Sequence, residues 1–284
     1  MTSFTVEESG RVDAAIAKEQ EVSRSFVKVL LDQGKVSIGD KVVYKPSVKV
    51  HPGDVVTLNY EPFTDADIPE IELEILYQDD DCLVVNKPVG VLTHSKGAFN
   101  PEATVSTFIR QFTTGMEDNR GGIVHRLDRV TSGLLICAKN EKALLHLQKQ
   151  FADRKTKKTY NAVVTGTPEL PEASIDMPIE RNPKKPQTFR VGPNGKPSTT
   201  NYKILKSNGT YSLLQLNPIT GRTHQLRVHL AQIEHPIVGD VLYGGETAER
   251  TYLHALSLEI TLPNGELKTF TAPLPSSFDA MLEA

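Results

Sequence analysis

Residues 121–136 read GGIVHRLDRVTSGLLI and place charged side chains between two apolar runs that are typical of buried strands. Rigid elements thus hold a polar loop from both sides, and protein scaffolds often carry binding and catalytic groups in such loops. We expect its central acid, Asp128, to be ionised because the adjacent cations Arg126 and Arg129 favour a charged carboxylate. An ionised Asp128 could act as nucleophile or base, or it could simply shape a turn that residues 131–133 complete.

The segments around this loop predict a sheet with helices. Residues 83–90 read LVVNKPVG, which indicates a buried strand that Pro88 and Gly90 end. Residues 199–205 and 211–216 alternate in period two on either side of an Asn-Gly pair at 208–209, which predicts a hairpin. Strand alternation places Tyr160 and Asn161 on opposite faces, and by pattern alone Tyr160 would be a core residue.

A helix is predicted after Gly221. Leu226, Leu230 and Ile233 recur at helical spacing, and the pattern ends before Pro236. Arg227 lies next to this apolar stripe, where an arginine on the helix surface is the plainer interpretation.

Two domains joined by an acidic linker are expected. Residues 1–60 show two helical patterns and then short strand signals, which predicts a small α+β domain. Residues 61–82 hold 9 Asp and Glu and no Lys or Arg, and we assign 61–78 to the linker. A larger domain then covers residues 79–284.

Composition excludes several classes of protein. The chain has 284 residues, 38% of them hydrophobic, and no apolar run approaches the roughly 20 residues of a membrane span. From the N-terminal residues we expect no secretory leader, and the sequence contains no P-loop, zinc signature or Gly-x-Ser-x-Gly motif. With only two cysteines, Cys82 and Cys137, each in an apolar setting, we expect buried thiols and a cytoplasmic protein without a metal site.

Charge is unevenly distributed along the chain. The net charge is −3, yet residues 149–206 carry 12 Lys and Arg against 5 Asp and Glu. A local excess of this kind suits a phosphate-bearing partner, although a solvated lysine-rich face would give the same count.

The N-terminal region resembles the S4 domain, a small RNA-binding fold. The resemblance spans roughly residues 9–60 and rests on the order of RVD at 11–13, SR at 23–24, GKV at 34–36 and VVTL at 55–58. It implies that Arg24, Lys28, Lys35 and also Lys41 face structured RNA. The alternative is a cap domain whose arginines only pair with Glu19 and Glu21.

The larger domain resembles the RluA-type pseudouridine synthases. Five blocks occur in the order of that family: NKPVG at 86–90, HRLDRVTSGLL at 125–135, KTYNAVVTG at 158–166, TGRTHQLRVH at 220–229 and HPIVGD at 235–240. Arg129 departs from the lysine of many relatives but keeps the charge. The resemblance implies an α+β fold in which helices flank a mixed, mainly antiparallel central sheet.

The resemblance also implies roles for individual residues. Asp128, Tyr160 and Arg227 would form the catalytic set, with Arg227 paired to Asp128 and Tyr160 against the base. Arg126 would fill the stack that a flipped-out uridine leaves. Further cations that we expect to contact RNA are Arg129, Lys157, Lys158 and Arg222.

The reaction itself needs neither a metal nor a cofactor, because a C–N glycosidic bond is exchanged for a C–C bond without redox chemistry. We expect a monomer that modifies structured RNA, and ribosomal large-subunit RNA rather than tRNA, by analogy with S4-bearing relatives. Two other functions remain open at this point: a non-catalytic S4-containing factor of ribosome assembly, and a nucleoside N-glycosidase.

Overall fold

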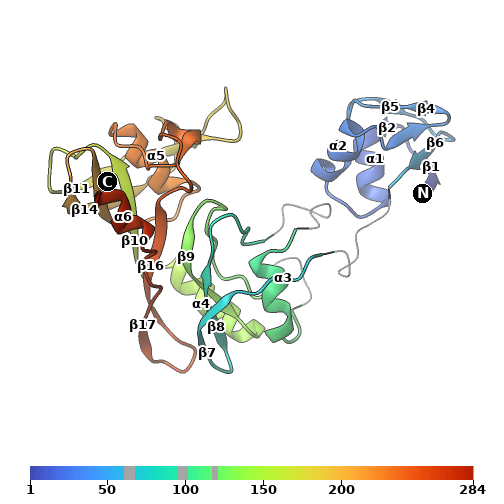
Figure 1. Ribbon diagram of the computed structural model, residues 1–284. Coiled ribbons are helices and arrows are strands. Elements are labelled where there is room, and N and C mark those ends of the chain that lie inside the picture. Colours follow the sequence, from blue (N-terminus) through green and yellow to red (C-terminus); the bar gives the residue numbers. More distant parts are fainter. Residues whose placement is uncertain (61–67, 95–101, 117–120, 284) are drawn as a thin grey trace. The chain divides into compact units, whose positions relative to one another are not determined.

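The computed structural model describes residues 1–60, 68–94, 102–116 and 121–283 (Figure 1). The chain forms two compact units. One holds the described residues from Met1 to Glu70, and the other holds Ile71–His94 together with the described residues from Ala103 onward. No helix in these described parts is both long and apolar enough to cross a bilayer.

The N-terminal unit packs two helices on a four-stranded sheet of order β1-β6-β3-β4. Ser23 caps the second helix by accepting a hydrogen bond from the Phe26 amide, and Gly34 follows its end with φ +66°. Its elements are β1 (Thr2–Thr5), β2 (Gly10–Arg11), α1 (Val12–Glu19), α2 (Arg24–Asp32), β3 (Val36–Ile38), β4 (Lys41–Val42), β5 (Lys49–Val50) and β6 (Val55–Leu58).

Strand β1 was not predicted from the sequence. It lies before the helices and pairs with β6, with Thr2 opposite Leu58 and Thr5 opposite Val55. Thr2–Thr5 is short and mostly exposed, so it carries almost no apolar alternation, and only its pairing with β6 identifies it as a strand.

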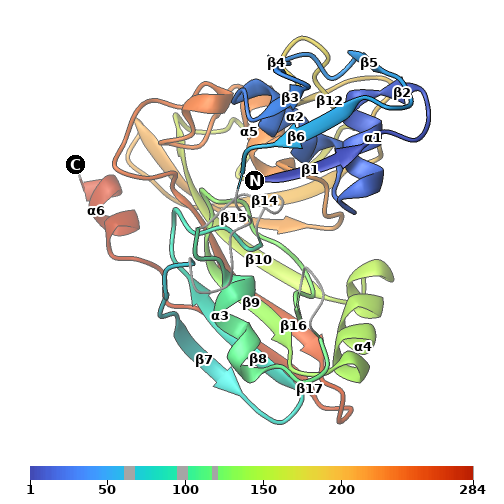
Figure 2. The same cartoon turned by 90° about the vertical axis from the view of Figure 1, so that its right-hand side faces the viewer.

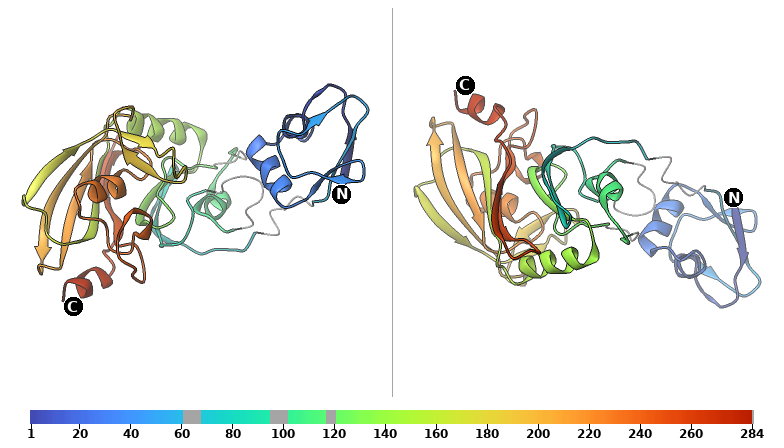
Figure 3. Two further views of the ribbon diagram at one scale, coloured as in Figure 1. Left: turned by 90° about the horizontal axis from the view of Figure 1, so that it is seen from above. Right: turned by 90° about the horizontal axis from the view of Figure 1, so that it is seen from below.

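The second unit is built on a sheet of nine described strands, and β9–β16 is its parallel pair. The order is β11-β14-β15-β10-β16-β9-β8-β7, with β17 also beside β16, and the sheet twists along this order (Figure 3). The strands are β7 (Glu74–Gln78), β8 (Cys82–Lys87), β9 (Ser132–Ala138), β10 (Lys157–Thr165), β11 (Glu172–Asp176), β14 (Thr199–Ser207), β15 (Tyr211–Pro218), β16 (Leu253–Thr261) and β17 (Leu267–Thr271).

Helices cover both faces of this sheet, which explains the continuous apolar runs Cys82–Val85 in β8 and Leu134–Ala138 in β9. Leu83 and Leu135 pack under α3 (Val105–Ile109), whereas Val84 and Ile136 pack under α4 (Glu141–Ala152) (Figure 2). The other helices are α5 (Gln225–Gln232), α6 (Ser277–Glu283) and the short turns η2 (Arg110–Phe112) and η3 (Val241–Tyr243). A separate hairpin pairs β12 (Ile179–Arg181) with β13 (Phe189–Val191).

This architecture confirms the α+β class with a mixed, mainly antiparallel sheet. The predicted hairpin is β14–β15, with Gly209 at φ +90° in its turn, and the predicted helix is α5. The predicted linker, residues 61–78, differs from the structure at its C-terminal end, because β7 lies within this range and pairs with β8. Residues 61–67 of the predicted linker lie outside the described residues. Pairing of β7 with the buried strand β8 therefore draws the end of this acidic segment into the larger unit.

Candidate active site

Asp128 lies in the loop that leads into β9. The preceding residue, Leu127, is buried, and the Thr93 hydroxyl both donates to its carbonyl (2.9 Å) and accepts from its amide (3.1 Å). The Thr131 amide donates to the Asp128 carbonyl at 3.0 Å, which closes a turn. The turn interpretation of Asp128 is therefore correct for its backbone, and the turn leaves the carboxylate facing a pocket.

Gly133 fixes where this loop joins the sheet. Its φ is +108°, and a Cβ atom at this position would lie 2.3 Å from the Ala255 carbonyl oxygen of β16. Only glycine allows the backbones of β9 and β16 to approach this closely.

Arg227 projects from α5 to the same pocket and joins two carboxylates. Its Nη1 donates to Asp128 Oδ2 at 3.3 Å, while its Nε and Nη2 donate to the two Asp240 oxygens at 2.7 and 2.8 Å. The side chain is only 5% exposed, so the surface interpretation of Arg227 is wrong. The bidentate bond to Asp240 fixes the plane of the guanidinium and thereby the direction of its bond to Asp128.

Arg227 stays charged between these two carboxylates. Burial works against a charged Arg227, but the bonds and charges of Asp240 and Asp128 outweigh it and raise the pKa of Arg227. The arginine stays protonated throughout the physiological range, and its guanidinium lies over the Tyr243 ring at 4.9 Å. Asp128 thus always faces a fixed positive charge.

His224 adds a second group beside Asp128. It precedes α5 in a left-handed conformation (φ +57°), and its Nε2 lies 3.8 Å from Asp128 Oδ2. Tyr243 accepts from the Phe189 amide, so its hydroxyl proton is available to His224 Nδ1 at 2.7 Å. Burial lowers the pKa of His224, and a neutral ring that accepts at Nδ1 carries its proton at Nε2, toward Asp128.

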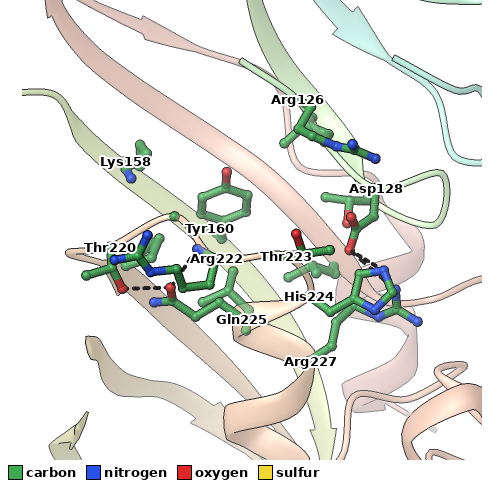
Figure 4. Close-up of a pocket in the computed structure, with 16 residues that line it drawn as sticks. Arg126, Asp128, Lys158, Tyr160, Thr220, Arg222, Thr223, His224, Gln225 and Arg227 are labelled. Carbon is green, nitrogen blue, oxygen red and sulfur yellow. Dashed lines mark hydrogen bonds and ion pairs between the residues drawn. The ribbon is translucent and has the colours of Figure 1, made fainter. Parts of the chain in front are cut away.

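Asp128, His224 and Arg227 line a cavity of about 140 Å³, close to the about 150 Å³ that holds a benzene ring in another protein. A single planar base is therefore a fitting occupant. Figure 4 shows Asp128, His224 and Arg227 at one end of the cavity, Lys158 and Arg222 toward the other, and Tyr160 between them. Burial and the nearby Asp128 charge raise the pKa of Tyr160, so its phenol is neutral.

The structure separates the predicted cations of this unit into two groups. Arg126, Lys158 and Arg222 line the cavity. Lys157 instead forms an ion pair with Glu259 at 2.6 Å, and Arg129 donates to the Gly90 carbonyl, so neither is brought to the cavity.

The predicted cations of the S4-like unit lie on α2 (Arg24, Lys28), just after it (Lys35) and at the start of β4 (Lys41). Arg24 donates to Asp13, a buried carboxylate that also binds Arg11, so its partner is neither Glu19 nor Glu21. Lys28 pairs with Asp32 one turn along the exposed side of α2. Lys35 and Lys41 are exposed.

Four groups near Asp128 were not identified from the sequence: His224, Asp240, Tyr243 and Lys87. Lys87 is fully buried and donates to the Pro88 and Val91 carbonyls, and the Gly90 amide in that same loop donates to the Arg129 carbonyl beside Asp128. Burial lowers the pKa of Lys87 to about 7. His224, Asp240 and Lys87 lie within the motif blocks that resemble the family, and this position in the sequence could have marked them as site residues. Their contacts with Asp128 and its neighbours are visible only in the folded chain.

Comparison with known proteins identifies the family. Residues 81–232 match the RNA pseudouridylate synthase family, and residues 10–56 match the S4 domain. The chain belongs to the RNA pseudouridylate synthase family. Both resemblances found in the sequence are thereby confirmed, and the protein is an RNA pseudouridine synthase that carries an S4 domain.

Relatives of this synthase cover nearly the whole chain. Ribosomal large subunit pseudouridine synthase D of Haemophilus ducreyi is 36% identical over 298 residues, which cover 96% of this chain and 90% of that protein. The Escherichia coli K12 protein of the same name is 35% identical with the same coverage. Among solved structures, human RNA Pseudouridylate Synthase Domain Containing 1 superposes with a TM-score of 0.62 at 30% identity, over 78% of this chain and 90% of that one.

No group of three or more metal-ligating side chains comes together within the described ranges. The acids at the site are instead committed to Arg227. The chemistry that the cavity offers is that of one carboxylate, one neutral phenol and one neutral imidazole around a space of the size of a base.

Proposed function

We propose that this synthase isomerises specific uridines of large-subunit ribosomal RNA to pseudouridine, with Asp128 as the catalytic residue. The observation that carries the proposal is the Asp128–Arg227 contact in a cavity of the size of a base. The relatives that span the chain are named for the ribosomal large subunit, which favours that RNA over tRNA.

The isomerisation proceeds through base flipping, glycosidic bond exchange and proton transfer. The uridine leaves its stack, at a cost of about a few kcal/mol, and enters the cavity. Asp128 acts at the glycosidic centre, where the N1–C1′ bond breaks and a C5–C1′ bond forms. The proton on C5 is then lost and N1 gains one, so the composition of the base is unchanged.

Two further side chains serve the bound base. The Tyr160 ring offers a stacking face, and its neutral hydroxyl can relay the C5 proton. Arg126 is exposed at the rim of the cavity, where its planar guanidinium can occupy the gap that the uridine leaves in the RNA. Arg227 acts through Asp128 and is a positioning residue.

The S4 domain supplies affinity for folded RNA through Arg24, Lys28 and Lys35. The buried Asp13 fixes the Arg24 guanidinium on the surface of α2 and so reduces the entropy lost on binding phosphate. We place the reaction in the cytoplasm with its RNA, and a monomer stays our prediction for the oligomeric state.

The substrate is tested by mapping pseudouridine in ribosomal RNA and tRNA from cells that lack the protein. We expect sites to disappear from large-subunit ribosomal RNA and to return when the wild-type chain is supplied. Loss confined to tRNA would contradict the ribosomal assignment. Free uracil released from RNA by the purified protein would instead indicate an N-glycosidase.

A further inference from the structure

A second depression adjoins the Asp128 cavity. It has a volume of about 410 Å³ and shares six lining residues with that cavity, so the two are continuous. We call it the flanking depression. The five residues that line it alone are His125, Phe151, Ala152, Arg154 and Ile219.

The flanking depression is cationic. Arg126, Arg154, Lys158 and Arg222 line it, and its lining as described contains no carboxylate. The cations around it that point elsewhere are paired: Lys149 with Asp153 and Lys157 with Glu259. In the described part of the chain Arg154 and Lys158 form no such ion pair, so this hollow concentrates positive charge that the protein does not neutralise.

Arg154 occupies a position where glycine is favoured. The Lys155 amide donates to the Gln150 carbonyl and the Arg154 amide to the Phe151 carbonyl, which is the pattern that ends a helix with a left-handed residue. Arg154 is that residue, with φ +57°. A long cationic side chain at a strained position is more consistent with a binding role than with a purely structural one.

Two stacked rings and one aliphatic side chain also line the depression. His125 stacks on Phe151 with ring centroids 4.5 Å apart and an angle of 19°. Burial lowers the pKa of His125 to about 3, so this ring is uncharged. Ile219 adds an apolar side chain that is 47% exposed. Aromatic or apolar surfaces beneath a cationic rim are what single-stranded nucleic acid binds.

We propose that the flanking depression binds the nucleotide next to the target uridine in the RNA strand, with Arg154 and Lys158 on its phosphate and Phe151 and Ile219 beneath its base. The inference rests on the proposed function, because it is the target uridine in the Asp128 cavity that delivers its neighbour. The continuity of the two hollows supplies the path for the strand.

Charge-removing variants test the phosphate contact. We expect Arg154→Ala and Arg154→Gly to reduce kcat/KM for tritium release from [5-³H]uridine-labelled large-subunit ribosomal RNA about tenfold. Lys155→Ala is the matched control, since Lys155 is adjacent, carries the same charge and does not line the depression. It should reduce kcat/KM less than about twofold, the effect of diffuse charge alone.

Stability separates binding from folding in the same variants. Glycine is favoured at φ +57°, so Arg154→Gly should unfold at a temperature no lower than the wild type while it loses activity. If both Arg154 variants match Lys155→Ala in activity, the proposal is wrong. A wild-type protein that binds the RNA but releases no tritium would refute the proposed function instead, and RNA affinity of the same three variants would still decide the phosphate contact.

Cross-linking tests which nucleotide is bound. A photoreactive benzophenone side chain introduced at Ile219 should cross-link to the nucleotide directly beside a uridine that the enzyme modifies. Cross-links that fall only on nucleotides distant from any pseudouridine would overturn the assignment, whatever the Arg154 variants show.

Discussion

Replacing Arg227 should reveal two separable functions of this side chain, one in stability and one in catalysis. Arg227→Met leaves the Asp240 carboxyl group, which is 2% exposed, without its ion-pair partner. Breaking a buried ion pair from one side costs about 3–5 kcal/mol of unfolding free energy. In Arg227→Met combined with Asp240→Leu, the buried charge is gone, and leucine has the same heavy-atom branching as aspartate, so most of that stability should return.

The catalytic loss should not return with it. Coulomb's law with an effective dielectric constant of about 20 gives about 5 kcal/mol for unit charges 3.3 Å apart, which bounds the Arg227 effect on Asp128 from above. Asp128 is partly exposed, so we expect a smaller loss, comparable to removing one oriented donor from an active site. That corresponds to a reduction in kcat of about 10²- to 10³-fold, equal in the single and the double variant.

Urea unfolding measures the first effect and tritium release from [5-³H]uridine-labelled ribosomal RNA the second. If the double variant regains stability and turns over within about threefold of the wild type, Arg227 serves only the fold. If the single variant is as stable as the wild type, the reasoning on the buried Asp240 charge is wrong.

Three further predictions follow from the same structure. The pKa of Lys87 is lowered to about 7 in the folded chain, so above that pH the unfolded chain binds one proton more than the folded chain. The free energy of unfolding should therefore rise by about 2 kcal/mol between pH 7 and 9. A Lys87→Met variant that unfolds with the wild-type pH dependence would contradict this. Tyr160→Phe should keep RNA affinity but reduce turnover by about 10²-fold, because it keeps the stacking ring and loses the hydroxyl that relays a proton; equal kcat would assign Tyr160 to stacking alone. Gly133→Ala should lower the free energy of unfolding by about 3 kcal/mol or more, because its Cβ would lie 2.3 Å from the Ala255 carbonyl oxygen. Thermal or urea unfolding measures this, and a variant of wild-type stability would show that β9 and β16 can separate.

The parts of the fold that could be predicted are those encoded over short distances. The β14–β15 hairpin follows from period-two alternation around one Asn-Gly turn, and α5 follows from three apolar residues at helical spacing. Asp128 stood out because its polar loop interrupts two apolar strands. Each of these signals depends on neighbours in sequence, which folding does not rearrange.

The contacts that tune the site could not be predicted this way. Asp240 binds Arg227 across a loop, and Tyr243 reaches His224 only because η3 lies beside the start of α5. Arg24 also binds Asp13, 11 residues away in the sequence, and no local pattern indicates that pair. Such pairs depend on tertiary packing, which residue type and spacing do not predict.

Activity of the Asp128→Asn variant tests the central claim most directly. The amide keeps the shape of the side chain and removes its charge, so we expect RNA affinity close to that of the wild type and no tritium release from [5-³H]uridine-labelled large-subunit ribosomal RNA. Tritium release at the wild-type rate by correctly folded Asp128→Asn protein would show that this carboxylate does not carry out the reaction.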